Sequence, residues 1–300
     1  MQVITAKLPA FTGAAVGTQP TCTPDILGRS FIGFVLKVVG TKVTADAAMD
    51  FCRFVDQIDV LVDGKVASTF YPKQERAKAL LFNANGDTIP TAFFNLQFVR
   101  PGIPFSEWGT ADLKSIQIRC TIPSSFATGG ALTRIEGWMQ YYLENVPREE
   151  AFVNRVVTPV TPGAGENTID KLEIGNLSRV RNLFITCPPA AANLTNGDAE
   201  AITRVQVRVG DVDVFDMEKD TVSAILASHP LYKLPTTQYG FFVPFDLNNQ
   251  APDFQTVRIG DTPLPVRVVY YWDTTITATP APVQFIIEGT EGVKLVAPPK

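Results

Sequence analysis

The feature that most constrains the fold of this chain is an internal repeat with a period of about 147 residues. The segment LGRSFIGFVLK, which starts at Leu27, aligns with LSRVRNLFITC from Leu177. Further along, VDQIDVLVDGKV from Val55 aligns with ITRVQVRVGDV from Ile202. The period is too long for one unit of a solenoid and is typical of a duplicated domain.

Both halves continue in the same order after these matches. Residues 103–105 (IPF) align with 243–245 (VPF), and residues 116–118 (IQI) align with 266–268 (VRV). The second half carries extra residues around FQTVRIGDTP, which starts at Phe254. Because the matches keep one order along the chain, we interpret the two halves as copies of one module.

Each half also contains one segment with helical periodicity. PKQERAKALLF starts at Pro72, and MEKDTVSAILA starts at Met217. The apolar residues at i, i+3 and i+4 are Ala77, Leu80 and Leu81 in the first segment and Val222, Ile225 and Leu226 in the second. We expect each amphipathic helix to cover the sheet of its own module, although such a helix could also dock on a partner or a membrane.

The rest of the chain has the pattern of short strands. Segments rich in Val, Ile, Phe, Thr and Tyr are separated by 23 Pro and 21 Gly residues. Residues 58–63 (IDVLVD) and 205–209 (VQVRV) alternate between two faces, as half-buried strands do. The dipeptides at 63–64 (DG) and 210–211 (GD) indicate tight hairpin turns.

These patterns predict an all-β protein made of two tandem eight-stranded antiparallel jelly rolls, each with a short flanking helix. A doubly wound parallel sheet is disfavoured because strands and helices do not alternate. We expect an N-terminal arm over 1–24, the first jelly roll over 25–150, a linker over 151–166, and the second jelly roll with a C-terminal tail over 167–300. The arm is expected to reach a neighbouring subunit or the membrane side, and a frayed terminus is the alternative.

Composition narrows the class of protein. The chain has 300 residues, of which 45% are hydrophobic and 19% charged, so it has enough apolar side chains for a sizeable hydrophobic core. The net charge of −4 argues against wrapping of duplex DNA, so no specific nucleic-acid binding is expected. The chain has no apolar run of about 18 residues, and its start, MQVITAKLPAFTGAAVG, lacks the apolar block of a secretory signal.

Residues with catalytic or metal-binding chemistry are sparse. Cys22, Cys52, Cys120 and Cys187 form no C-x-x-C pair and are expected to be buried, reduced thiols. His229 is the single histidine and precedes a proline in a turn-like context. Phosphate-binding loops and nucleophile-elbow motifs are absent. We therefore assign no catalytic residues, no cofactor and no metal site.

Two side-chain groups suggest weaker alternatives. The acids Asp211, Asp213, Asp216 and Glu218 could contribute oxygens to a calcium site, although acids on an alternating strand more often face water. Seven aromatic residues near the ends of the two halves could instead form a sugar-binding platform or fill cores and subunit contacts. These residues are Trp108, Trp138, Trp272, Tyr141, Tyr142, Tyr270 and Tyr271.

A family resemblance rests on three features: the duplication, the length, and the element at residues 58–81 (IDVLVDGKVASTFYPKQERAKALL). Over roughly residues 25–290, the chain resembles the double jelly-roll major capsid proteins of membrane-containing icosahedral bacteriophages of the tectivirus and corticovirus kind. The resemblance implies a homotrimer that forms a pseudo-hexameric capsomer and tiles an icosahedral shell over an internal membrane. It also implies neighbouring capsomers and vertex or minor capsid proteins as partners, and a protein made in the host cytoplasm and located in the virion.

Some segments are compatible with other functions. The turn-rich loop from Pro188 could be surface-exposed or bind an ion, and Lys294 and Lys300 in the tail could meet lipid phosphate or simply be solvated. A glycan- or host-binding, spike-like β-sandwich protein is the main alternative to a shell protein. A glycan hydrolase or amidase on a double β-sandwich is a weaker one, because no spacing singles out a catalytic pair of acids.

Overall fold

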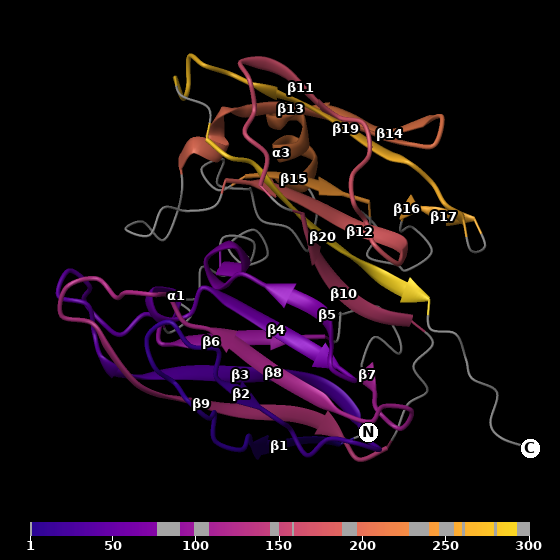
Figure 1. Cartoon of the computed structure of the whole chain (residues 1–300). Coiled ribbons are helices and arrows are strands. Elements are labelled where there is room, and N and C mark those ends of the chain that lie inside the picture. The colour runs from indigo at the N-terminus through magenta and orange to yellow at the C-terminus, as the bar shows by residue number, and fades with distance from the viewer. Residues whose placement is uncertain are drawn as a thin grey trace, which may run out of the picture. The chain divides into compact units, whose positions relative to one another are not determined.

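The computed structural model divides the chain into two compact units (Figure 1). Unit 1 comprises Met1–Pro72, Ile89–Val153 and Glu291–Lys300, and unit 2 comprises Lys73–Thr88 and Asn154–Thr290. The residues that the structure describes are 2–76, 91–98, 108–144, 150–157, 159–187, 197–227, 240–245, 255–259, 262–278 and 281–292.

Unit 1 contains two antiparallel sheets and the short helix α1 (Phe51–Phe54). The first sheet has the order β1–β9–β3–β6, with β7 also paired to β3, and the second has the order β2–β8–β4–β5. The strands are β1 (Val3–Lys7), β2 (Thr21–Cys22), β3 (Ser30–Thr41), β4 (Gln57–Val62), β5 (Lys65–Phe70), β6 (Phe93–Gln97), β7 (Trp108–Gly109), β8 (Ile116–Thr121) and β9 (Ala131–Tyr142).

Unit 2 repeats this arrangement. One sheet has the order β10–β20–β12–β15, with β16 also paired to β12, and the other has the order β11–β19–β13–β14. The strands are β10 (Glu150–Val156), β11 (Gly165–Ile169), β12 (Leu177–Thr186), β13 (Ile202–Val209), β14 (Val212–Glu218), β15 (Phe241–Pro244), β16 (Gln255–Thr256), β17 (Arg258–Ile259), β18 (Thr262–Pro263), β19 (Val266–Trp272) and β20 (Gln284–Gly292). The start of β10 and the end of β20 extend into the residue ranges assigned to unit 1. Its helices are the 3₁₀-helix η1 (Gly197–Ala201) and α3 (Lys219–Ala227).

The two units have one topology. In each, the first strand pairs with the last, and the last with the third, in one four-strand path. In each, the second strand begins the other path and the hairpin β4–β5 or β13–β14 ends it. Both units are therefore jelly rolls of eight principal strands, as the repeat predicts, and β7, β16 and the hairpin β17–β18 are additions. The hairpin lies in the insertion expected around Phe254.

Alternation of side chains builds the core of each jelly roll. Along β8, Ile116, Ile118 and Cys120 are buried while the intervening residues are half-buried. At the β4–β5 turn, Asp63 and Gly64 both have positive φ values, 51° and 77°, as a type I′ hairpin turn requires. The hairpin predicted at this dipeptide is confirmed.

The predicted helices are described to different extents. Helix α3 contacts β13, β14 and β15 and buries Val222 and Leu226, so it covers its own module as expected. In the first half, residues 72–76 are helical. Ala77, Leu80 and Leu81, which define its predicted apolar face, lie outside the described residues.

The module boundaries differ from those expected from the sequence. The segment expected to be an arm contains β1, which pairs with β9 along its whole length, and also contains β2. The segment expected to be a linker contains most of β10 and the start of β11. These strands lie at the edges of the jelly-roll sheets. The sequence pattern does not predict them, because an edge strand of low hydrophobicity between polar and Pro-rich neighbours has no clear strand signal. In addition, Lys73–Thr88, from the first half of the sequence, belongs to unit 2.

All four cysteines are buried and reduced, as expected. Burial raises the pKa of the Cys22 thiol to about 11 and also raises that of Cys120. We therefore expect native protein to react with a thiol reagent such as DTNB far more slowly, at about pH 8, than protein unfolded in guanidinium chloride. Rapid modification of even one thiol in the native state would contradict this packing.

Candidate functional site

The carboxylates considered for calcium are held by arginines. Asp213 accepts two hydrogen bonds from Arg208, at 2.7 and 2.9 Å. Asp216 accepts two from Arg204, at 2.9 and 2.8 Å. The hydrogen bond from Arg208 also lowers the pKa of Asp213. These cross-strand pairs between β13 and β14 occupy the oxygens that a cation would need.

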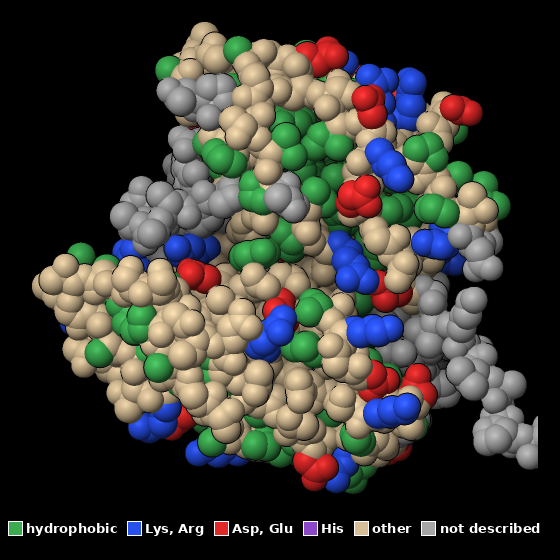
Figure 2. Space-filling view, in the orientation of Figure 1, with side chains coloured by type: hydrophobic (Ala, Val, Ile, Leu, Met, Phe, Trp, Pro, Cys, Tyr) green, Lys and Arg blue, Asp and Glu red, His purple; other side chains and the backbone are tan. Residues whose placement is uncertain are grey.

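Figure 2 shows basic and acidic side chains intermingled at the β13–β14 end of unit 2 on the visible face. Among the described residues, no group of three or more His, Cys, Asp or Glu side chains could hold a metal ion. The acids Asp211 to Glu218 thus give no support to a calcium site.

The seven aromatic residues considered for a sugar platform do not form one surface. Four are buried and belong to the cores: Trp108, Tyr141, Trp272 and Tyr270. The other three, Trp138, Tyr142 and Tyr271, are half-buried. The first two lie on β9 in unit 1 and the third on β19 in unit 2. The core interpretation therefore holds for most of the set.

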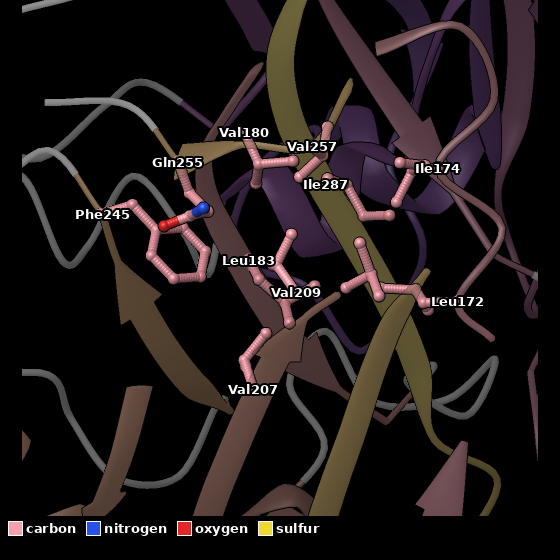
Figure 3. Close-up of a pocket in the computed structure, with 11 residues that line it drawn as sticks. Leu172, Ile174, Val180, Leu183, Val207, Val209, Phe245, Gln255, Val257 and Ile287 are labelled. Carbon is pink, nitrogen blue, oxygen red and sulfur yellow. The ribbon is translucent and has the colours of Figure 1, made fainter. Parts of the chain in front are cut away.

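A small pocket lies in unit 2 between its two sheets (Figure 3). Leu183 and Ile287 from one sheet face Val207 and Val209 from the other, and Gln255 is the one polar residue in the lining. The cavity volume is about 10 Å³, which is room for no more than about one water molecule. The pocket is a packing defect of the core and is too small for a ligand.

Lys219, at the start of α3, is largely buried. Its Nζ donates hydrogen bonds to the carbonyl oxygens of Ala199 and Glu200, at 3.4 and 3.1 Å. Desolvation lowers its pKa from 10.5 to about 8. The pairing with carbonyls and the place beside η1 indicate a structural role.

The lowered pKa of Lys219 predicts a specific pH dependence. Between about pH 8 and pH 10.5 the unfolded chain holds this proton more strongly than the folded protein, so stability rises with pH. The free energy of unfolding should gain up to about 3 kcal/mol across this window. In Lys219→Met the gain should be missing, as urea titrations of both proteins at several pH values will test. Parallel pH profiles would contradict the assignment.

The outer face of the β1–β9–β3–β6 sheet in unit 1 is a candidate contact surface. Alternation points the odd-numbered residues of β9 into the core and the even-numbered residues outward. We call this surface the β9 face and define it by Thr5, Lys7, Lys37, Phe93, Arg134, Glu136, Trp138, Gln140 and Tyr142. Each of these side chains is half-buried or exposed.

Charged and aromatic side chains lie next to one another on the β9 face. Lys37 Nζ lies 5.4 Å from the centre of the Phe93 ring, and Arg134 Nε donates a 2.8 Å hydrogen bond to Glu136 Oε1. The pKa of Glu136 is lowered first by that hydrogen bond and also by the charges of Lys7 and Lys37. Three cations thus act on one carboxylate beside half-buried aromatic rings.

The corresponding face of unit 2 is buried. Backbone hydrogen bonds fix the equivalence: Leu8 N donates to Gly137 O in unit 1, and Val157 N donates to Phe285 O in unit 2. Thr5 therefore corresponds to Asn154, Glu136 to Gln284, and Gln140 to Glu288. We call the surface formed by Asn154, Gln284, Ile286, Glu288 and Thr290 the β20 face, and each of its side chains is at most 4% exposed.

The hydrogen bonds between side chains on the β20 face are not predictable from the sequence pattern. Glu288 accepts hydrogen bonds from Arg181 Nη1 at 3.3 Å and from Asn182 Nδ2 at 3.1 Å, and all three residues are buried. Gln74 bonds to Gln284, and Asn154 Nδ2 donates to Glu75 Oε1 at 2.9 Å. The helical segment 72–76 thus supplies two polar contacts to this face of unit 2.

Several residues considered above lie outside the described part of the chain. They are His229, Lys294, Lys300 and most of the loop from Pro188. In the described residues, no helix is both long and apolar enough to cross a membrane.

Several solved structures that resemble this chain are viral capsid proteins. The major capsid protein of bacteriophage PM2 superposes with a TM-score of 0.74 and 14% identity, covering 98% of this chain and 99% of that one. For the major capsid protein of STIV, the Sulfolobus turreted icosahedral virus, the values are 0.64 and 9%, with 99% and 100% covered. For the PBCV-1 virus capsid they are 0.60 and 9%, with 96% and 93% covered.

No protein-family model matches this sequence, and no curated protein matches it either. The similarity to the capsid proteins extends over whole chains, includes both jelly rolls and leaves no large segment unmatched. This chain has the double jelly-roll fold of those major capsid proteins. The fold expected from the resemblance is confirmed.

Proposed function

We propose that this chain is a major capsid protein that self-associates as a trimer and tiles the shell of an icosahedral virus. The observation that carries the proposal is the match, over whole chains, to major capsid proteins from bacteriophage PM2 and STIV. Two equivalent jelly rolls in one chain give a trimer six similar modules, and such a block can tile a closed surface.

The proposed role is structural. The protein would act through contact surfaces on its sheet faces and loops, and this role needs neither a catalytic group nor a cofactor. An internal membrane beneath the shell, neighbouring capsomers and vertex proteins are part of the proposal through the family resemblance. The virion is the corresponding location, after synthesis in the host cytoplasm.

The mass of the protein in solution tests the trimer. Size-exclusion chromatography with multi-angle light scattering should give three times the chain mass of 32.7 kDa. The mass should persist on dilution, because a capsomer must exist before a shell can form. A mass of one chain at every concentration would contradict the proposal.

A further inference from the structure

We propose that the β9 face of unit 1 binds the β14–α3 segment of a second copy of this chain. The proposal rests on the trimeric capsid function above and adds to it the contacting surfaces. It also specifies a head-to-tail contact, in which one surface of each copy meets a different surface of the next.

Two equivalent sheet faces of the chain differ in exposure. The β20 face is at most 4% exposed, and two of its polar residues, Gln284 and Asn154, are bonded to Gln74 and Glu75. The β9 face has the same strand order and register, yet its side chains are half-buried or exposed. A face that is covered in one module is therefore still accessible in the other.

The segment that covers the β20 face has an equivalent in the second half of the chain. Residues 72–76 directly follow the β4–β5 hairpin of the first half, and α3 directly follows the equivalent β13–β14 hairpin of the second half. In the repeat, Glu75 corresponds to Asp220. Asp220 is exposed in the first turn of α3, as are Thr221, Ala224 and Ala227 on the outward side of that helix.

The covering segment of the first half lies on the face of unit 2. A second copy can supply the equivalent segment, from its own β14–α3 region, to the β9 face. Each copy would then offer one face and one segment, and repetition of the same contact closes a ring. Three copies, with six modules, are the ring that the proposed trimer requires.

The β9 face and the β14–α3 segment also differ in charge. The β9 face carries Lys7, Lys37 and Arg134 around the single acid Glu136. The end of β14 and the start of α3 carry the exposed acids Glu218 and Asp220. Basic and acidic surfaces of this kind steer association and fix register. The half-buried rings of Trp138 and Tyr142 would form the apolar centre of the contact.

The test compares two face variants and one segment variant with wild-type protein. Trp138→Glu places a charge at the centre of the β9 face, and Lys7→Glu/Lys37→Glu reverses its charge without touching the core. Asp220→Arg/Ala224→Arg adds bulk and positive charge, the same sign as on the β9 face, to the exposed side of α3. Ile276→Glu, at an apolar residue that is 47% exposed in a turn of unit 2, is the matched control.

We expect each face variant and the segment variant to lose the trimer and run at the mass of one chain, with an unchanged circular dichroism spectrum. The control should stay trimeric. A mixture of a face variant and the segment variant has one intact contact for each pair of chains, so it should give a species of two chains and no ring. This mixing result is specific to a head-to-tail contact.

Other results would overturn the proposal. If wild-type protein is trimeric and both face variants remain trimeric, the β9 face does not make this contact, although the capsid function stands. If the face variants stay trimeric but lose binding to phosphatidylglycerol vesicles, the occupant of the face is a lipid surface. A monomeric wild-type protein would instead contradict the proposed function itself.

Discussion

Replacement of Glu288 by Ala is expected to destabilise the protein by about 3–5 kcal/mol, because it leaves the buried Arg181 guanidinium without its carboxylate. The two side chains are only 7% and 4% exposed, and their charged atoms lie 3.3 Å apart. Asn182, which also donates to Glu288, would lose its acceptor. Urea or guanidinium chloride titration of the free energy of unfolding measures the loss.

An exposed pair provides the control for Glu288→Ala. Arg208 and Asp213 are each 42% exposed in their side chains, so Asp213→Ala should destabilise the protein far less than Glu288→Ala, even though the pair is bidentate. The double variant Arg181→Met/Glu288→Met should recover most of the loss, because both buried charges are gone. Equal losses from Glu288→Ala and Asp213→Ala would show that burial of the first pair does not decide its energy.

Replacement of Trp108 by Ala is expected to cost about 3–5 kcal/mol, as deletion of a large buried side chain does. Trp108 is 1% exposed and stacks on Phe98, with ring centres 4.5 Å apart and planes 23° apart. It also lies on β7, a two-residue strand that pairs with Ser30 and Phe31 of β3. The substitution therefore removes apolar burial and leaves a cavity at the edge of the sheet.

Trp108→Phe separates two contributions to stability: the stacking of an aromatic ring and the larger volume of the indole. It should cost clearly less than Trp108→Ala, because an aromatic ring still fills most of the site next to Phe98. Thermal and denaturant unfolding of the two variants measure the difference. Equal destabilisation by both, or none by either, would contradict the packing described for unit 1.

The sequence predicted the features that repeat. Two similar orders of strands predicted two jelly rolls, the Asp63-Gly64 dipeptide predicted the β4–β5 turn, and the spacing of Val222 and Leu226 predicted α3. Each of these follows from local periodicity or turn chemistry, which a single chain displays directly.

Features set by contacts between distant segments were not predictable. The strand β1 was interpreted as part of an arm, because VITAK is a short edge strand whose pairing with β9 involves residues far away in sequence. The pair Arg181–Glu288 was missed, because charged residues in a strand pattern normally indicate a solvated face. The repeat also predicted that the helix after Pro72 covers its own module, whereas Lys73–Thr88 belongs to unit 2.

Electron cryo-microscopy of the purified protein, alone and assembled, is the decisive test of the proposed capsid role. We expect a threefold-symmetric block with a near-hexagonal outline, built from six jelly rolls that pack into a continuous curved layer. Particles that contain a single copy with two jelly rolls, and no ordered layer under any assembly condition, would contradict it.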